Sequence, residues 1–175
     1  NIGLAQEWDL VLNLAKEIRD ELITIWIIGE GVKKEYLKSQ IEKHNLSNIK
    51  LLPYQDRKYM PAINLFADFH FIAMDKSMEN DGFPSKVYSI MASGRPMVIV
   101  SSENTPITSF LSETDTSLLV TDHSLSGFKN AVLKLALDKK LRISLGTNGR
   151  KIIDQDYTKE KVINQYATLF KKIFI

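Results

Sequence analysis

Residues that could bind a ligand are concentrated in one stretch, DGFPSKVYS, which runs from Asp81 to Ser89. Gly82 can adopt a positive φ angle and Pro84 has a fixed one, so the segment begins with a tight turn. Pro84 or Ser85 can then open a helix, because the first amides of a helix have no partner inside it. These amides, with Lys86 in the first turn, predict an anion-binding site. A phosphate-bearing ligand is the obvious candidate.

Other residue types that carry chemistry form no comparable pattern. His44, His70 and His123 share neither a segment nor the spacing of metal ligands, so no metal site is expected. His70 lies between two phenylalanines in an apolar run and is expected to be a hydrogen-bonded core histidine. The chain has no cysteine, which excludes disulfides and thiolate chemistry.

A helix and a strand are expected to position this stretch. Apolar residues recur at helical spacing after Lys86, and Gly94 is expected to end the helix. Pro96 prevents the helix from resuming, and Met97–Val100 is apolar throughout, which indicates a short strand.

The rest of the chain alternates apolar strands with amphipathic helices. Further strands are expected at 23–28, 49–54, 69–74 and 117–120, and further helices at 9–20, 33–44, 58–67 and 106–113. Two or three helices follow from about residue 125, with breaks expected at 146–149 and at 156–157. The strand 23–28 contains Trp26 in a continuous β-branched run, which predicts burial on both faces. This alternation predicts an α/β fold: a Rossmann-like, doubly wound parallel sheet with helices on both faces.

Length and composition limit the class of protein. The chain has 175 residues, of which 44% are hydrophobic and 25% charged, as in a single globular domain. The net charge of only +2 does not indicate a protein that binds nucleic acid through a strongly basic surface. No apolar run approaches the roughly 18 to 20 residues that a membrane span needs, so a cytoplasmic location is expected.

Five segments, in order and at matching spacing, give the sequence a family resemblance over essentially its whole length. They are NIGLAQEWD, IWIIGEG, NIKLLPYQDRKYMPAI, ADFHFI and GFPSKVYSIMASGRPMVIV. Together they resemble the C-terminal, donor-binding half of GT-B fold glycosyltransferases of the retaining, family-4-like kind. The last segment is similar to the family pattern G-x-P-x-K-x-x-E-x-M-A-x-G-x-P-V-V, in a form found in exopolysaccharide and colanic-acid-type enzymes.

The resemblance implies transfer of a sugar from a UDP- or GDP-linked donor, with no cofactor and no obligatory metal. The implied acceptor is a saccharide or a lipid-linked saccharide in surface polysaccharide synthesis, held by an N-terminal domain that is absent here. Residues 1–175 are then one nucleotide-sugar-binding domain, expected to bind donor but not to transfer it alone. A helix at about 158–175 closes the chain, and its stripe of Val162, Tyr166, Leu169, Phe170 and Ile173 is expected to pack across the hinge between the two domains. Peripheral contact of the whole enzyme with the inner face of the membrane is the alternative role for this basic tail.

The resemblance also implies which residues hold the donor. Asp81 would contact the donor sugar, and Lys86 would stabilise the leaving nucleotide electrostatically. The other donor-binding residues implied by the match are Gly3, Gln6, Gly82, Phe83, Pro84 and Ser85 for the diphosphate, Ser89 for the ribose, and Gly29, Gly31 and Tyr54 for the nucleoside.

Four positions depart from the family pattern. Two glutamates of the family fall on Asp81 and Ser89, and its diphosphate-neutralising Arg and Lys fall on Asn1 and Gln6. Lys86 is then the main cation left. These departures keep two alternatives open: a nucleotide-sugar epimerase of the same fold, and a degenerate, non-catalytic module that assembles a synthesis complex.

Overall fold

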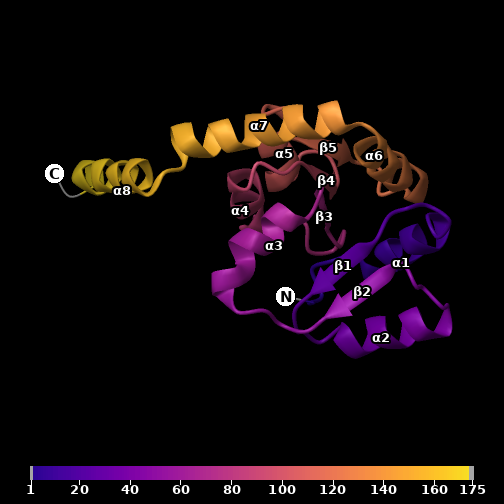
Figure 1. The fold of residues 1–175 in the computed structure, drawn as a ribbon. Helices are drawn as coiled ribbons and strands as arrows, with labels where there is room; N and C mark the ends of the chain where they lie inside the picture. The colour runs from indigo at the N-terminus through magenta and orange to yellow at the C-terminus, as the bar shows by residue number, and fades with distance from the viewer. Residues whose placement is uncertain (1, 174–175) are drawn as a thin grey trace.

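The computed structural model describes residues 2–173, so Asn1 lies outside the described residues (Figure 1). The strands are β1 (Ile25–Ile28), β2 (Ile49–Leu52), β3 (His70–Ala73), β4 (Met97–Val100) and β5 (Ser117–Val120). The helices are α1 (Trp8–Glu17), α2 (Lys34–Lys43), α3 (Met60–Phe66), α4 (Lys86–Ala92), α5 (Pro106–Ser112), α6 (Leu125–Leu137), α7 (Lys139–Asp156) and α8 (Lys159–Ile173). A short 3-10 helix, η1 (Arg57–Tyr59), precedes α3.

All strand pairs are parallel, as the alternation of strands and helices predicts. β1 pairs with β2 in one sheet, and a second sheet has the order β3-β4-β5. The segment that leads into α1 lies beside the end of β3, where Gln6 bridges to Met74.

Side chains of β4 alternate between two cores, one on each face of its sheet. Val98 and Val100 belong to the core that contains buried residues of α1 and α6. Met97 and Ile99 belong to the core formed with α4 and α5. Because both faces of β4 are covered by helices, the expected Rossmann-like architecture is confirmed.

β1 differs from its prediction on one face. Ile25 and Ile27 are buried, but Trp26 is 47% exposed, so the expectation of burial on both faces is wrong. The indole packs against Phe66 of α3, with 4.9 Å between ring centroids. Since α3 covers this face only in part, one side of the tryptophan stays in contact with solvent.

α7 is continuous through 146–149, so the break expected there is wrong. The chain instead breaks at Asp138, which caps α7 by accepting a hydrogen bond from Leu141 N at 2.8 Å. Gly146 and Gly149 are buried, and they face the end of α4, where Gly94 has the positive φ of +67° expected of a helix end. The two glycines therefore permit close helix packing rather than a turn.

α5 begins with a capping box. The Thr105 side chain accepts a hydrogen bond from Thr108 N, and the Thr108 hydroxyl accepts one from Thr105 N at 3.1 Å. Because this cap satisfies two amides of the first turn, Thr105→Ala should lower the free energy of unfolding by about 1 to 2 kcal/mol. Urea denaturation would measure it, with the exposed Ser109→Ala on the same helix as control, expected within about 0.5 kcal/mol of the parent. Equal effects of the two substitutions would contradict the capping role.

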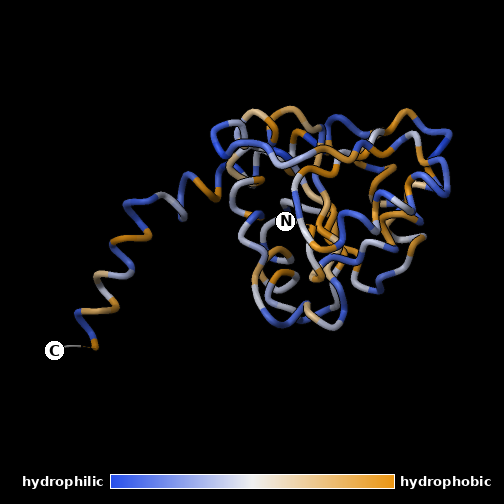
Figure 2. The backbone as a smooth tube through the Cα atoms, turned by 90° about the horizontal axis from the view of Figure 1, so that it is seen from below, coloured by the Kyte–Doolittle hydropathy of each residue, from blue (hydrophilic) through white to orange (hydrophobic). Residues whose placement is uncertain are grey.

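α8 projects from the rest of the protein (Figure 1), and none of its described residues is buried. Hydrophobic residues recur along it, as Figure 2 shows; Tyr166 is 59%, Leu169 51% and Ile173 61% exposed. The predicted stripe is thus present but does not pack on the rest of this domain. No described helix is long and apolar enough to cross a membrane.

Candidate functional site

The segment after residue 2 joins two strand ends at the carboxyl edge of the sheets. Ile2 N donates to Glu30 O at 2.8 Å, just after β1, and Asp75 N donates to Ala5 O at 3.0 Å, just after β3. Within the segment, Gly3 N donates to the Gln6 side chain at 3.2 Å, and the Trp8 indole donates to Gly3 O at 2.8 Å. Gly3 and Gln6 are therefore fixed at the predicted edge, although the Gln6 carboxamide is engaged with this turn.

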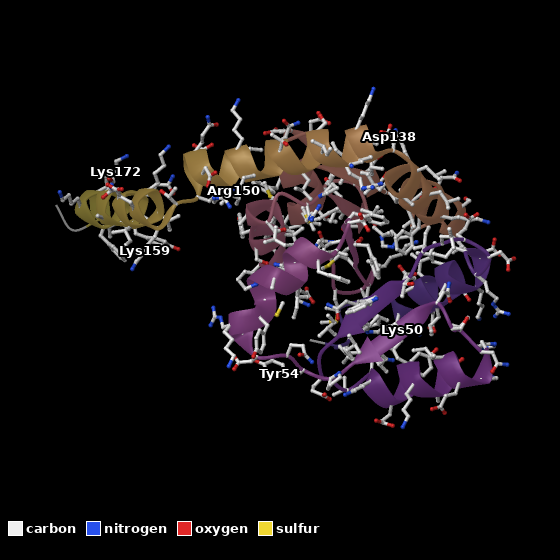
Figure 3. The ribbon with its side chains drawn as sticks, in the orientation of Figure 1. Lys50, Tyr54, Asp138, Arg150, Lys159 and Lys172 are labelled. Carbon is white, nitrogen blue, oxygen red and sulfur yellow. The ribbon has the colours of Figure 1, made fainter. Side chains whose placement is uncertain are left out.

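The turn after β1 is tied to the loop after β2. Gly29 and Gly31 have φ angles of +139° and +155°, which favour glycine at both positions. Between them, Glu30 accepts a hydrogen bond from Tyr54 N at 3.4 Å and pairs with Lys34 at 2.6 Å. The hydrogen bond from Lys34, with that from the Tyr54 amide, lowers the pKa of Glu30. Tyr54 itself is 65% exposed where β2 leads to η1 (Figure 3). The turn after β1 and the loop after β2, both predicted to contact the nucleoside, are thus brought together.

Asp81 to Lys86 lie in the loop after β3 and at the start of α4. Asp81 N donates to Met78 O at 3.1 Å, and the Asp81 side chain is exposed. A Cβ atom at Gly82 would meet nothing within 4 Å, and the positive φ that Gly82 could adopt is not used here. Ser85 precedes α4 without a side-chain cap. The exposed Lys86 ammonium forms no hydrogen bond or ion pair with any residue of 2–173.

Two of the residues predicted to bind the donor have side chains that contact other parts of this chain. Phe83 packs against Tyr88 and Phe110, with centroids 5.3 Å and 5.4 Å away. The Ser89 hydroxyl donates to Lys86 O at 2.9 Å, inside its own helix. Pro84 O accepts a hydrogen bond from Val87 N at 3.0 Å. Within the described part of the chain, no hydrogen bond joins Asp81 or Lys86 to the Gly3 turn.

A buried charged cluster at the same edge escaped the sequence analysis. His123 Nδ1 lies 2.9 Å from Glu7 Oε2, and its Nε2 lies 3.0 Å from Glu79 Oε2. The same Glu79 oxygen accepts hydrogen bonds from the Ser101 hydroxyl at 3.2 Å and from Ser102 N at 2.8 Å. The carboxylate of Glu79 and the imidazole of His123 therefore connect four segments. These are the loops after β3, β4 and β5, and the start of α1.

Burial would raise the pKa of Glu79, but hydrogen bonds from Ser102 and His123 outweigh it and hold this pKa below its ordinary value of 4.5. A depressed folded-state pKa stabilises the protein above that value, and the contribution is lost as the pH falls through the folded-state pKa. We therefore expect Glu79→Gln to flatten the loss of stability between about pH 6 and about pH 3. Urea titrations across this range would show it, with the exposed Glu113→Gln as control. An unchanged pH dependence in Glu79→Gln would contradict this assignment.

Histidines and acids form no metal centre here: no group of three among the described residues could hold a metal ion. His70 is half-buried and lies 3.1 Å from Asn64 O through Nε2, so the expected hydrogen bond is confirmed. Burial lowers the pKa of His70.

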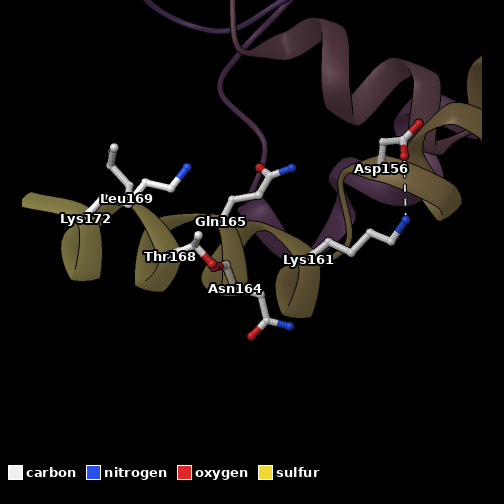
Figure 4. A pocket seen from close by; sticks show the side chains of 7 residues that line it. All are labelled: Asp156, Lys161, Asn164, Gln165, Thr168, Leu169 and Lys172. Atoms are coloured by element: carbon white, nitrogen blue, oxygen red, sulfur yellow. Dashed lines mark hydrogen bonds and ion pairs between the residues drawn. The ribbon is translucent and has the colours of Figure 1, made fainter.

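Two of the surface depressions among the described residues are relevant to ligand binding. One runs along the polar side of α8, where Lys161 pairs with Asp156 at 3.6 Å, and its other lining residues are mostly uncharged and polar (Figure 4). The other, of about 330 Å³, lies at the sheet edge between the Gly3 segment, the start of α2 and the loop after β3. It is lined by Leu4, Gln6, Glu7, Trp8, Asp9, Lys33, Tyr36, Asp75, Ser77 and Met78. Only the second adjoins the predicted donor residues.

Comparison with known proteins gives one family. Residues 2–152 match the family described as glycosyl transferases group 1. The putative colanic acid biosynthesis glycosyl transferase WcaI of Escherichia coli K12 is 29% identical over 107 residues, which cover 61% of this chain and 26% of WcaI.

Solved structures share the fold. Anabaena HepE, in complex with UDP and glucose, superposes with a TM-score of 0.79 at 15% identity, covering 95% of this chain and 45% of HepE. The C-terminal domain of the group 1 protein LpcC from Francisella tularensis superposes with a TM-score of 0.71 at 18% identity, covering 90% of this chain and 83% of that domain. The chain spans about a quarter of WcaI and less than half of HepE, but most of the LpcC domain.

Proposed function

Because this chain belongs to the glycosyl transferases group 1 family, we propose that it is the donor-binding domain of a glycosyltransferase. The donor is a UDP- or GDP-linked sugar, and the acceptor is a saccharide or lipid-linked saccharide in surface polysaccharide synthesis. The likeness to WcaI, named for colanic acid biosynthesis, and to HepE, solved with UDP and glucose, supports both choices.

One observation carries the proposal: an unpaired cation lies beside an open backbone at the carboxyl edge of a parallel sheet. Lys86 is exposed and has no partner among residues 2–173, and a Cβ atom added at Gly82 would meet no atom beyond its chain neighbours within 4 Å. Parallel sheets of this type bind ligands outside the carboxyl ends of their strands. A diphosphate approaching Gly82 would meet backbone without steric hindrance and gain a charge-assisted contact with Lys86.

The turns that follow β1 and β2 fit the nucleoside end of the same ligand. Gly31 is exposed in the turn after β1, and the ring of Tyr54, a residue that is 65% exposed, offers a stacking surface. The Glu30 bond to Tyr54 N holds these two turns together.

Leaving-group stabilisation is the chemistry that these residues would supply. Negative charge grows on the diphosphate as the sugar leaves, and Lys86 would stabilise that charge more strongly in the transition state than in the ground state. Asp81, exposed at the same loop, would hold the donor sugar. We propose that this chain needs no metal cofactor for that step, and that transfer retains the anomeric configuration, as in the family it resembles.

This domain alone should bind donor without transferring it, because we propose that the acceptor is held by a second domain. The apolar stripe of α8 supports this proposal. The stripe is exposed to solvent in this domain. Packing across a hinge would remove its apolar surface from water.

A titration of UDP, GDP and their sugar conjugates, followed by amide NMR shifts, tests the proposal. We expect saturable shifts at Gly3, at 82–86 and around Gly29–Gly31. Shifts confined to other surfaces, or none at millimolar ligand, would contradict donor binding and favour the non-catalytic assembly module. Conversion of the nucleotide-sugar without any acceptor would instead identify an epimerase.

A further inference from the structure

The imidazole of His123 is enclosed between two carboxylates. Both ring nitrogens lie within 3.0 Å of a carboxylate oxygen, one on Glu7 and one on Glu79, and the side chain is 2% exposed. Each ring nitrogen is thus within hydrogen-bond distance of a carboxylate oxygen, so the ring joins Glu7 to Glu79. Asp75 and Asp122 are the other charged groups that act on this ring or its partners, and both are acidic.

The backbone at His123 shows that the position is constrained. Its φ is +54°, a left-handed conformation that is uncommon for a residue other than glycine. Such a conformation persists only where surrounding contacts hold it. The two carboxylate contacts of the ring are contacts of that kind.

The cluster connects two segments that belong to the proposed donor site. Glu7 ends the Gly3 segment at the start of α1, and Glu79 lies in the loop after β3, shortly before Asp81. Ser101 and Ser102 fasten Glu79 to the end of β4. His123, which follows β5, is thus the link that joins the segment of Gly3 to the loop that carries Asp81 and Gly82.

We propose that His123 is a positioning residue: its imidazole clamps the Gly3 segment to the 75–85 loop and so fixes the two sides of the donor diphosphate site relative to each other. The effect on donor affinity rests on the proposed function, whereas the clamp itself does not. His123 cannot act on the ligand directly, because its ring is buried and both nitrogens are occupied.

Amide hydrogen exchange of the ligand-free protein tests the clamp. His123→Asn suits the test, because asparagine tolerates a positive φ but its side chain is too short to reach both carboxylates. We expect exchange to accelerate about tenfold or more at 77–85 and at 3–7, while α7 is unchanged. The control is His44→Asn, at a half-buried histidine after α2 that is not part of the cluster.

Removal of one carboxylate contact separates a clamp from simple packing, and it also serves if His123→Asn fails to fold. Glu7→Gln removes one carboxylate charge and should loosen 3–7 while leaving 77–85 tied to Glu79.

Nucleotide affinity is measured on the same variants, with UDP as the probe. We expect His123→Asn to weaken UDP binding about tenfold and His44→Asn to leave it unchanged. Loosened loops without UDP binding to the parent would support the clamp and contradict the proposed function. Unchanged loop exchange, or loosened loops with unchanged UDP affinity, would overturn the positioning role of His123.

Discussion

Gly146→Ala should lower the free energy of unfolding by about 2 to 3 kcal/mol. A Cβ atom at this position would lie 2.0 Å from Gly94 O and 2.8 Å from Gly94 C. Both contacts are to backbone, which cannot rotate away, so α7 would have to move off the end of α4. The greater helix propensity of alanine, worth about 1 kcal/mol, offsets only part of that cost.

Gly149→Ala is the matched control, one helical turn further along α7. A Cβ atom there would meet Met91 at 3.4 to 3.5 Å, close to ordinary van der Waals contact with a flexible side chain. We expect a change between neutral and about 1 kcal/mol of stabilisation. Thermal and urea unfolding would measure both variants. A Gly146→Ala protein as stable as Gly149→Ala would contradict the close approach of α7 to Gly94.

Lys86→Ala should weaken binding of a nucleotide diphosphate about tenfold to a hundredfold. The exposed ammonium has no protein partner to lose among the described residues, so the substitution should leave stability unchanged. A hydrogen bond to a charged group contributes about 1.5 to 3 kcal/mol, which corresponds to this range of affinity.

Calorimetric titration with UDP and with uridine would locate the loss. Uridine lacks the diphosphate, so its weaker binding should be insensitive to Lys86→Ala. Lys140→Ala, on the exposed surface of α7, changes the net charge equally and should leave both affinities intact. Equal losses in the two lysine variants would assign the effect to net charge rather than to a site.

Residues that end helices and strands, such as glycine and proline, explain how much of the fold was predictable. Met97–Val100 was placed to the residue because Gly94 and Pro96 end the preceding helix, and Ser117–Val120 was placed equally well. The turns that follow the strands share one edge because parallel strands end on the same side, and that rule needs no knowledge of contacts. The gathering of the predicted donor residues at this edge follows from the same rule.

Features that depend on tertiary contact were not predictable. A glycine pair in a polar sequence indicates a break, and only the approach of Gly94 shows that Gly146 serves helix packing instead. The exposure of Trp26 depends on how much of β1 the short α3 covers. The His123 cluster joins residues 116 and 44 positions apart, and local spacing carries no signal for such pairs.

A crystal structure of this chain with UDP bound tests the central claim most directly. The account predicts the diphosphate beside Gly82 and within charge-assisted hydrogen-bond distance of Lys86 Nζ, with the uracil at the Gly29–Gly31 turn and Tyr54. Density for UDP along α8, or in any place where neither Lys86 nor the Gly29–Gly31 turn contacts it, would contradict the assignment of this sheet edge as the donor site.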